Sequence, residues 1–284
     1  MPAVTMTEML KQARSQHYAV GAFNILEYSS MLAVVRAAEE LSAPVIVQTS
    51  AKTVKYWSHK TVINWFRELA DDSPVPVAIH LDHCKDLEFI QECLDTGWTS
   101  VMFDGSSMPY QENLDLTQKV LAMADAASAS VEAEVGPIGG VEDDMFVEES
   151  EAHLADPEEA IRFCEGLNLG VFAPAIGTAH GVYKGEPRIA FDRIEEIAEG
   201  TGLPLALHGG TGLSGEVFHQ CIQLGCAKVN ISTQLKHTYI DSFVDYHAKH
   251  QEYEPLKPMA AQFEQMKREI AEKIELFGGA GKCR

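Results

Sequence analysis

Eight short runs of β-branched and apolar residues, separated by longer amphipathic segments, restrict the fold of this chain more than any other feature. The runs cover residues 19–24, 45–49, 77–81, 100–103, 130–134, 170–175, 205–207 and 227–231. Between them lie segments such as SSMLAVVRAAEEL, with apolar residues at helical spacing, and DPEEAIRFCEGL, with Asp156 as cap and Pro157 in the first turn. Strands that alternate with helices indicate a parallel sheet, and eight of them indicate a closed (β/α)8 barrel.

The 284 residues are expected to form one domain, residues 1–284, because no shift in composition marks a second one. Two more helices are predicted after the eighth run, at about residues 234–247 and 258–276. Residues 136–155 are the one long irregular stretch, and their glycines and acidic side chains favour either a mobile loop over a site or a solvated acidic loop.

The composition excludes several classes of partner. A formal net charge of −20 would repel nucleic acids and anionic membranes overall, whereas a small anionic substrate could still be bound by local cations or backbone amides. No apolar run approaches the roughly 20 residues that cross a bilayer, and the first residues carry no apolar signal core. Six cysteines without a CxxC pair indicate reduced thiols. We therefore expect a cytoplasmic protein.

Polar residues that a barrel interior normally excludes lie where the expected strands end. In a parallel barrel these ends meet at one mouth, where active sites of this architecture are built. The residues are Asn24, Gln48, Ser50, Asp82, His83, Asp104, Glu132, Glu134, His180, His208, Asn230 and Thr233.

Three histidines from different strands, His83, His180 and His208, suit a divalent metal, because neutral imidazole ligates zinc and three protein ligands leave a position open for substrate. His80 is an alternative to His83, since it lies two residues before Asp82 on the same strand face. We favour His83 because it is nearer the end of the strand.

The motifs HGGTG (residues 208–212) and NIST (residues 230–233) follow the seventh and eighth runs, where such barrels often bind phosphate. Glycines allow backbone amides to approach phosphate oxygens, and nearby hydroxyls add donors. Either motif alone is typical of a tight turn, but on adjacent strands they predict a phosphate site. The hydroxyl donors are Thr211, Ser232 and Thr233.

At AIHLDHCKDL, VEAEVGPIGGVEDD, AIGTAHGVYKGEPRI, LHGGTG and KVNIST, in this order, the chain resembles the class II, metal-dependent ketose-bisphosphate aldolases. These enzymes cleave fructose or tagatose 1,6-bisphosphate. The likeness runs from about Gly21 to the FGGAGKC tail, and therefore covers nearly the whole chain.

The resemblance implies roles for individual residues. Glu134 would offer an alternative or outer contact to the metal, Asp82 would be the acid that protonates and polarises the aldehyde carbonyl, and Glu142 would be the base that moves the proton on the dihydroxyacetone-phosphate carbon. One Zn²⁺ per subunit would be held by His83, His180 and His208. The phosphate would lie against Gly181, Gly209, Gly210, Thr211, Asn230 and Thr233, with Asn24, Ser50 and Ser232 as further candidates.

The implied reaction is the reversible cleavage of a ketose 1,6-bisphosphate, or a related ketose 1-phosphate, to dihydroxyacetone phosphate and an aldehyde. Cleavage leaves an enediolate, whose charge a chelated metal stabilises, and a base on a closing loop can exclude water. The resemblance further implies a monovalent cation, Na⁺ or K⁺, at carbonyls near Ala179, Gly181 and Gly209. It also implies a homo-oligomer, dimer or tetramer, in carbohydrate metabolism such as glycolysis, and for the tagatose type a non-catalytic partner subunit.

The chain departs from the family pattern at the distal phosphate. Many relatives carry a D-P-R segment there, whereas residues 254–256 read EPL, and the arginine expected shortly afterwards is Ala260. Either the aldehyde lacks a phosphate or other cations replace the arginines. The candidate replacements are Lys184, Lys257 and Arg188.

Two alternatives remain at the level of sequence. Lys228 on the eighth strand is the lysine best placed for Schiff-base aldol chemistry, but the three histidines would then have no role. The second alternative is a non-catalytic, sugar-phosphate-binding barrel subunit. Such a protein would not need an acid, a base and metal ligands together.

Overall fold

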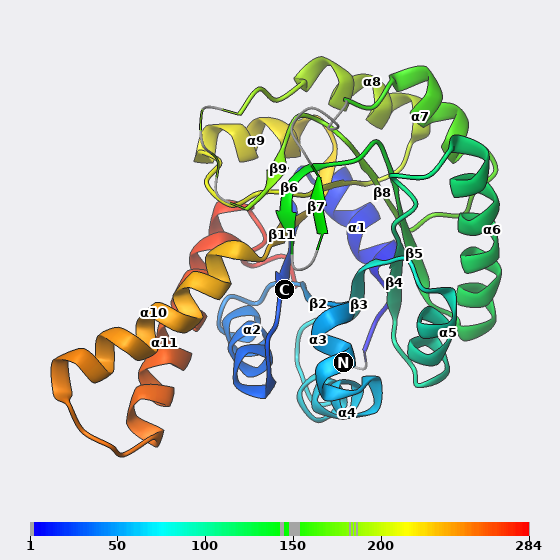
Figure 1. Cartoon of the computed structure of the whole chain (residues 1–284). Helices are drawn as coiled ribbons and strands as arrows, with labels where there is room; N and C mark the ends of the chain where they lie inside the picture. Colours follow the sequence, from blue (N-terminus) through cyan, green and yellow to red (C-terminus); the bar gives the residue numbers. More distant parts are fainter. Residues whose placement is uncertain are drawn as a thin grey trace.

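Eight parallel strands close into a barrel in the order β1-β11-β10-β8-β5-β4-β3-β2, with helices around the outside (Figure 1). The structure is a computed structural model that describes residues 3–142, 145–147, 154–181, 183, 185 and 187–283, without the side chains of residues 141–142 and 145–147. The predicted (β/α)8 barrel is confirmed. Its strands are β1 (Val20–Asn24), β2 (Val45–Ser50), β3 (Val77–Cys84), β4 (Ser100–Phe103), β5 (Ser130–Val135), β8 (Val171–Pro174), β10 (Leu205–Leu207) and β11 (Cys226–Ile231).

Each barrel strand builds the core with one face and the site with the other. In β3, Ile79 and Leu81 belong to the main apolar core, whereas His80 and Asp82 are buried polar residues inside the barrel. This follows from the period of two along a strand, which sends successive side chains to opposite faces. The interior is consequently rich in polar groups at its carboxyl end.

The helices cover the outer face of the barrel, and their ends follow local signals. Asp156 caps α7 by accepting a hydrogen bond from the Glu159 amide at 3.0 Å, and Pro157 is the first helical residue, as expected. The helices that surround the strands are α2 (Tyr28–Glu40), α3 (Ala51–Trp57), α4 (His59–Ala70), α5 (Leu87–Asp95), α6 (Tyr110–Ala127), α7 (Pro157–Cys164), α8 (Phe191–Thr201) and α9 (Gly215–Gln223).

The first helix, α1 (Met6–Ser15), closes the amino end of the barrel. Met6 and Leu10 are buried in an apolar cluster with inward residues of the strands, including Ala78 and Ala206. The backbone N–H of Met6 donates to Oγ of Ser130, the first residue of β5, at 3.1 Å. Small side chains in the lower barrel leave the room that the α1 side chains fill.

Three further strands form a small sheet in the order β7-β6-β9. They are β6 (Gly139–Glu142), β7 (Met145–Val147) and β9 (Ala179–His180). The prediction that residues 136–155 are irregular throughout was therefore wrong for β6 and β7. Gly140 explains the error, because it is a strand residue with φ 104° at which a Cβ would lie 2.2 Å from the carbonyl oxygen of His180. Only glycine permits this close approach, so a residue that is typical of loops here makes a strand possible.

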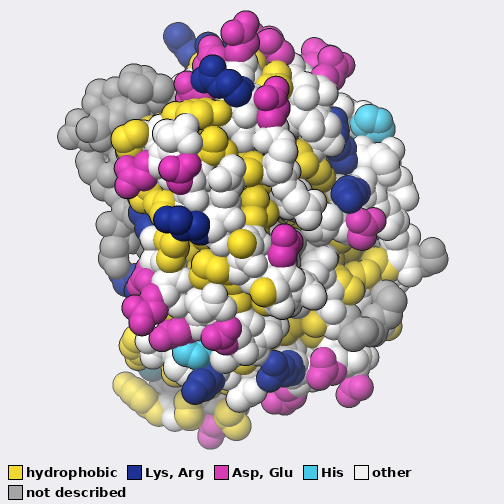
Figure 2. Space-filling view, turned by 90° about the vertical axis from the view of Figure 1, so that its right-hand side faces the viewer, with side chains coloured by type: hydrophobic (Ala, Val, Ile, Leu, Met, Phe, Trp, Pro, Cys, Tyr) yellow, Lys and Arg dark blue, Asp and Glu magenta, His cyan; other side chains and the backbone are white. Residues whose placement is uncertain are grey.

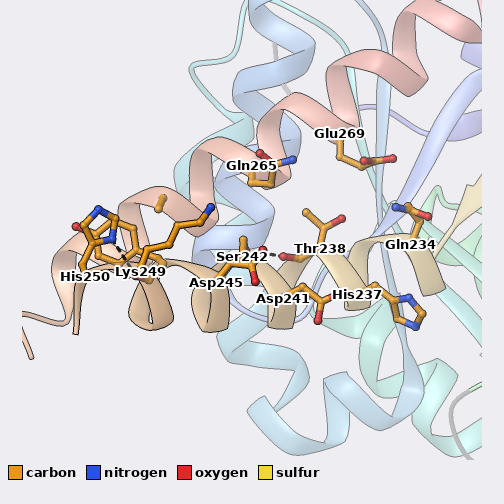
Figure 3. Close-up of a pocket in the computed structure, with 12 residues that line it drawn as sticks. Gln234, His237, Thr238, Asp241, Ser242, Asp245, Lys249, His250, Gln265 and Glu269 are labelled. Atoms are coloured by element: carbon orange, nitrogen blue, oxygen red, sulfur yellow. Dashed lines mark hydrogen bonds between the residues drawn. The ribbon is translucent and has the colours of Figure 1, made fainter. Parts of the chain in front are cut away.

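Helices α10 (Thr233–His250) and α11 (Leu256–Leu276) form a hairpin that projects from the barrel (Figure 1). A cavity of about 590 Å³ lies between them, lined by polar side chains such as Thr238, Asp241 and Gln265 (Figure 3). Both helices were predicted, with slightly shorter bounds. Among the residues that line the cavity, Gln234 is the one at the start of α10, next to the barrel.

Candidate active site

Three histidines meet at the mouth of the barrel. Nitrogen atoms of His83, at the end of β3, of His180, in β9, and of His208, directly after β10, all lie within 4.8 Å of one another. Nε2 of His83 is 2.9 Å from Nδ1 of His208. Three imidazole nitrogens that face a common point fit a divalent metal such as zinc and leave a coordination position for a substrate.

In two of these rings, a carboxylate lies beside the nitrogen that does not face the other histidines. Nδ1 of His83 lies 3.2 Å from Oδ2 of Asp104, and Nε2 of His208 lies 2.7 Å from Oε1 of Glu132. A carboxylate at one nitrogen keeps the hydrogen there and leaves the other nitrogen as a ligand, which is the usual support of metal-binding histidines. Burial lowers the pKa of His208 to about 4, so its ring is neutral at neutral pH, as a ligand must be.

A backbone irregularity directs His83 into the mouth. His83 has φ 46°, and the register between β3 and β4 shifts between Leu81 and Cys84. Regular alternation would send Asp82 inward and His83 outward, whereas a bulge of this kind re-aims one side chain. As a result Nε2 of His83 lies 3.9 Å from Oδ1 of Asp82.

His80, the alternative ligand, lies deeper inside the barrel and does not join the three-histidine group. Its side chain is fully buried, with Nδ1 2.8 Å from Oγ of Ser100 and Nε2 3.2 Å from Oε2 of Glu132. Its Nδ1 is therefore hydrogen-bonded and its Nε2 lies beside a carboxylate, both below the mouth.

Glu134 joins Asp104 beside His83. Asp104, Glu134 and His83 form a second group whose ligand atoms lie within 4.8 Å of one another, and Oε2 of Glu134 is 3.7 Å from Nδ1 of His208. Burial and the negative charge of Asp104 raise the pKa of Glu134 well above its usual value. Burial also opposes the ionisation of Asp104, but the hydrogen bond and charge of His83 lower the pKa of Asp104. A nearby cation would favour the ionised form of both carboxyl groups.

Asp82 is buried beside the three histidines, and one of its two carboxylate oxygens accepts a hydrogen bond. Nδ2 of Asn24 donates to Oδ2 of Asp82 at 3.1 Å, and Oδ1 of Asn24 accepts from Gln48 at 2.9 Å. The other oxygen, Oδ1, has no hydrogen-bond partner among the described residues. Asp82 thus presents one oriented oxygen next to His83. Ser50 pairs with Asp82 in the register of β2 and β3, which places it at the same end of the barrel.

The two glycine and hydroxyl motifs converge at the start of α10. Oγ1 of Thr211 accepts from the Gln234 amide at 3.4 Å, and Thr233 is the first residue of α10. Nδ2 of Asn230 and Oγ of Ser232 are buried without a hydrogen-bond partner among the described residues. Amides and hydroxyls at a helix amino terminus are suited to a phosphate.

Gly209, Gly210 and Gly181 bring the loops after β9, β10 and β11 together. Gly209 has φ 66°, and a Cβ on it would lie 2.4 Å from the carbonyl oxygen of Ala179, while a Cβ on Gly210 would lie 3.1 Å from that of Asn230. Gly181 has φ 89°. Tyr183, which the sequence did not single out, fixes this junction, because its hydroxyl donates to the Gly209 carbonyl at 2.7 Å and accepts from the Ala179 amide at 3.1 Å.

Other predicted residues fall outside this cluster or outside the described part of the chain. The backbone of Glu142 ends β6, two residues after Gly140, which pairs with His180, but the Glu142 side chain is outside the described residues, as is Lys184. Lys257 lies in the hairpin near the α10–α11 turn and pairs with Glu252 at 2.6 Å. Figure 1 shows this turn at the end of the hairpin far from the barrel.

Lys228 does not have the properties of a Schiff-base lysine in this structure. Its side chain is fully buried, with Nζ 2.8 Å from Oε2 of Glu132 and 2.7 Å from Oδ1 of Asn230. A lysine side chain that is fully buried and engaged in this way with a carboxylate and an amide oxygen is not free to attack a carbonyl of the substrate. The geometry therefore favours the metal-dependent alternative.

The family model for class II fructose-bisphosphate aldolases matches residues 4–282. The chain belongs to this family. A fructose-bisphosphate aldolase of Geobacillus stearothermophilus is 40% identical over 100% of this chain and 99% of its own length. One of Staphylococcus aureus is 38% identical over the full length of both. Among solved structures, the YdjI aldolase of Escherichia coli K12 is 29% identical, with a TM-score of 0.88 over 99% of this chain and 100% of its own.

As a member of the family, the protein is an enzyme of the aldolase class, a carbon–carbon lyase that acts on a phosphorylated sugar. No helix in the described part of the chain is both long and apolar enough to span a membrane. In Figure 2, acidic side chains are spread over the visible face with lysines and arginines among them, in keeping with the formal charge of −20.

Proposed function

We propose that the protein is a zinc-dependent aldolase that reversibly cleaves a ketose 1,6-bisphosphate, of the fructose or tagatose type, or a related ketose 1-phosphate. The products are dihydroxyacetone phosphate and an aldehyde. The observation that carries the proposal is the convergence of three imidazole nitrogens beside a buried, oriented Asp82. His83, His180 and His208 would hold one Zn²⁺ per subunit, with Glu134 as an alternative or outer contact.

The bound zinc would supply positive charge that stabilises the enediolate oxygens, and the remaining steps belong to residues of this chain. Asn24 holds one oxygen of Asp82, so that the other can take the proton from the substrate hydroxyl that becomes the aldehyde oxygen during cleavage, and can give it back to that oxygen during condensation. Glu142, on the segment beside β9, would move the proton on the dihydroxyacetone-phosphate carbon. These roles require Asp82 and Glu142 to act on opposite fragments of the substrate.

The phosphate of the dihydroxyacetone fragment would bind at the start of α10. Asn230 and Ser232 offer buried polar atoms there, and the amides of Gly209 and Gly210 add donors. Gly181, Thr211 and Thr233 would contribute to the same phosphate site, with Asn24 and Ser50 as further candidates. Carbonyls near Ala179, Gly181 and Gly209 would hold a monovalent cation, Na⁺ or K⁺.

Zinc dependence is tested by removing and restoring the metal. We expect a chelator to abolish release of dihydroxyacetone phosphate and one equivalent of zinc per subunit to restore it. Borohydride with substrate should trap no adduct on Lys228. Activity that survives complete removal of the metal, or a trapped lysine adduct, would overturn the proposal in favour of Schiff-base chemistry.

The aldehyde half is tested with a panel of substrates. Because EPL at residues 254–256 and Ala260 replace the expected distal residues, and Lys257 is paired with Glu252, ketose 1-phosphates should retain a large share of the kcat/KM found with fructose and tagatose 1,6-bisphosphates. A preference for a bisphosphate by more than about 100-fold, equivalent to about 2.7 kcal/mol, would show that other cations, such as Lys184 or Arg188, bind a distal phosphate.

A homo-oligomer, dimer or tetramer, and a cytoplasmic location complete the proposal. Ile240 and Val244 on α10 are 59% and 57% exposed, and exposed apolar side chains on a projecting hairpin are typical of a subunit contact. Light scattering of the purified chain measures the subunit number, and co-purification shows whether a tagatose-type partner subunit is present.

A further inference from the structure

An ion pair with no contact to solvent crosses the interior of the barrel. Glu132 on β5 and Lys228 on β11 are both fully buried, and Oε2 of Glu132 lies 2.8 Å from Nζ of Lys228. The two strands are not neighbours in the sheet, since β8 and β10 lie between them. The pair therefore spans the barrel below the three-histidine group.

Each member of the pair contacts one residue of the mouth. Oε1 of Glu132 is 2.7 Å from Nε2 of His208, so Nε2 carries the hydrogen and Nδ1 is left to face His83. Nζ of Lys228 donates to Oδ1 of Asn230 at 2.7 Å. An ammonium group only donates, so the oxygen of the Asn230 amide must point to Lys228 and Nδ2 must point away.

Nδ2 of Asn230 takes no part in the contact with Lys228. It is buried and has no hydrogen-bond partner among the described residues. It is one donor with a fixed direction, at the position where the chain turns into α10. Without Lys228, the Asn230 amide could rotate and present its oxygen, which would repel a phosphate. The orientation of a phosphate donor thus depends on a lysine that the phosphate cannot reach.

We infer that Glu132 and Lys228 are a positioning pair that sets, from inside the barrel, both the metal-facing nitrogen of His208 and the anion-facing amide of Asn230. The inference rests on the proposed function and adds two positioning residues to it. Stability alone gives little reason for the pair, because buried ion pairs are often replaced by apolar side chains without loss. His80 completes the surroundings of Glu132, with Nε2 at 3.2 Å and Nδ1 directed to Ser100.

The test measures binding separately from turnover. In Glu132→Gln, the dissociation constant for zinc, from competition with a chelator, should rise about 10- to 100-fold, as is usual when the support of a metal-binding histidine is lost. In Lys228→Met, the dissociation constant for dihydroxyacetone phosphate should rise about 10-fold or more. Lys267→Met removes a surface lysine that pairs with Glu40 at 2.8 Å, and should change neither constant.

A double-mutant cycle separates positioning from general loss of structure. Asn230→Ala should weaken binding of dihydroxyacetone phosphate and leave zinc binding unchanged. In the Lys228→Met background, the same substitution should raise the dissociation constant for dihydroxyacetone phosphate by less than about 2-fold. If the effects of Lys228→Met and Asn230→Ala on the free energy of binding dihydroxyacetone phosphate are fully additive, the positioning role of Lys228 is overturned. If a single variant does not fold, Glu132→Gln/Lys228→Met removes both charges together and should still show both binding defects.

The outcomes also separate this inference from the proposed function. If the wild-type protein binds zinc and dihydroxyacetone phosphate but does not cleave ketose phosphates, the proposed reaction is refuted. The positioning pair can still be tested in that case. If the Glu132→Gln and Lys228→Met variants fold and bind zinc and dihydroxyacetone phosphate as tightly as the wild-type protein, the positioning role of the pair is refuted, whatever their activity.

Discussion

Asp82 and His83 are consecutive residues, yet both face the barrel mouth. The positive φ of His83 makes this possible, since it breaks the alternation that would separate them. The proposed proton donor and the proposed metal ligand are thereby placed 3.9 Å apart by a single backbone irregularity. The sequence showed which two residues were involved but not the bulge, because a bulge depends on how β3 is paired with β4.

At this scale we predict that proton transfer and metal binding can be separated by mutation. Asp82→Ala and Glu142→Ala should each lower kcat by about 10²- to 10⁴-fold, the usual contribution of a general acid or base, with zinc content close to one per subunit. His180→Ala should lose both zinc and activity. The measurements are steady-state kinetics and metal analysis of the same samples. Normal turnover in Glu142→Ala would exclude its role as base.

At the scale of elements, the small sheet pairs the segment of Glu142 with the segment of His180, a proposed metal ligand. Gly140 of β6 pairs with His180 of β9, two residues before Glu142. Both the expected base and the expected ligand therefore depend on a contact that only glycine allows. Movement of β6 would change the position of both.

Gly140→Ala should consequently impair the site more than the fold. Its Cβ would meet the His180 carbonyl oxygen, and a non-glycine residue at φ 104° costs about 1–3 kcal/mol. We expect weaker zinc binding and a fall in kcat of at least about 10-fold, with an unchanged far-ultraviolet circular dichroism spectrum. The control is Gly185→Ala in the loop that follows β9, where a Cβ meets nothing within 4 Å. Equal effects of the two substitutions would contradict this account.

The sequence predicted the elements whose residues repeat a local pattern. The eight barrel strands were found because each is a short β-branched, apolar run and amphipathic segments of helical spacing lie between the runs. Helices α10 and α11 were expected after the eighth run, with slightly shorter bounds. Strands β6, β7 and β9 are only two to four residues long, and β6 begins with two glycines, so no periodicity marks them. The same reason applies inside the site: His83 was preferred to His80 from its place in the strand, whereas the contacts of Tyr183 and of Glu132 with Lys228 arise only when distant strands meet.

At the scale of the whole molecule, metal binding should stabilise the barrel as one unit, because the three ligands come from β3, β9 and the end of β10. Free zinc at about 100 times its dissociation constant adds about 2.7 kcal/mol to the free energy of unfolding. For a chain of this size we expect Tm to rise by about 4 to 5 °C in a single transition.

His180→Ala is the control for this experiment, since it should unfold at a Tm that zinc does not change. Calorimetry with and without a chelator gives both values. Two separate transitions, of which zinc shifted only one, would show that residues 1–284 do not unfold as the single domain expected from the sequence.

Helix α1 lies across the amino end of the barrel. The backbone of Met6 is hydrogen-bonded to the first residue of β5, and Leu10 is buried in a cluster that includes several alanines of the strands. Helix α1 therefore separates the buried charges of Glu132 and Lys228 from solvent at the amino end of the barrel. For protein engineering, an affinity tag ahead of Met6 is compatible with this arrangement, whereas a truncation that removes α1 would open a second entrance and hydrate Glu132 and Lys228 from beneath.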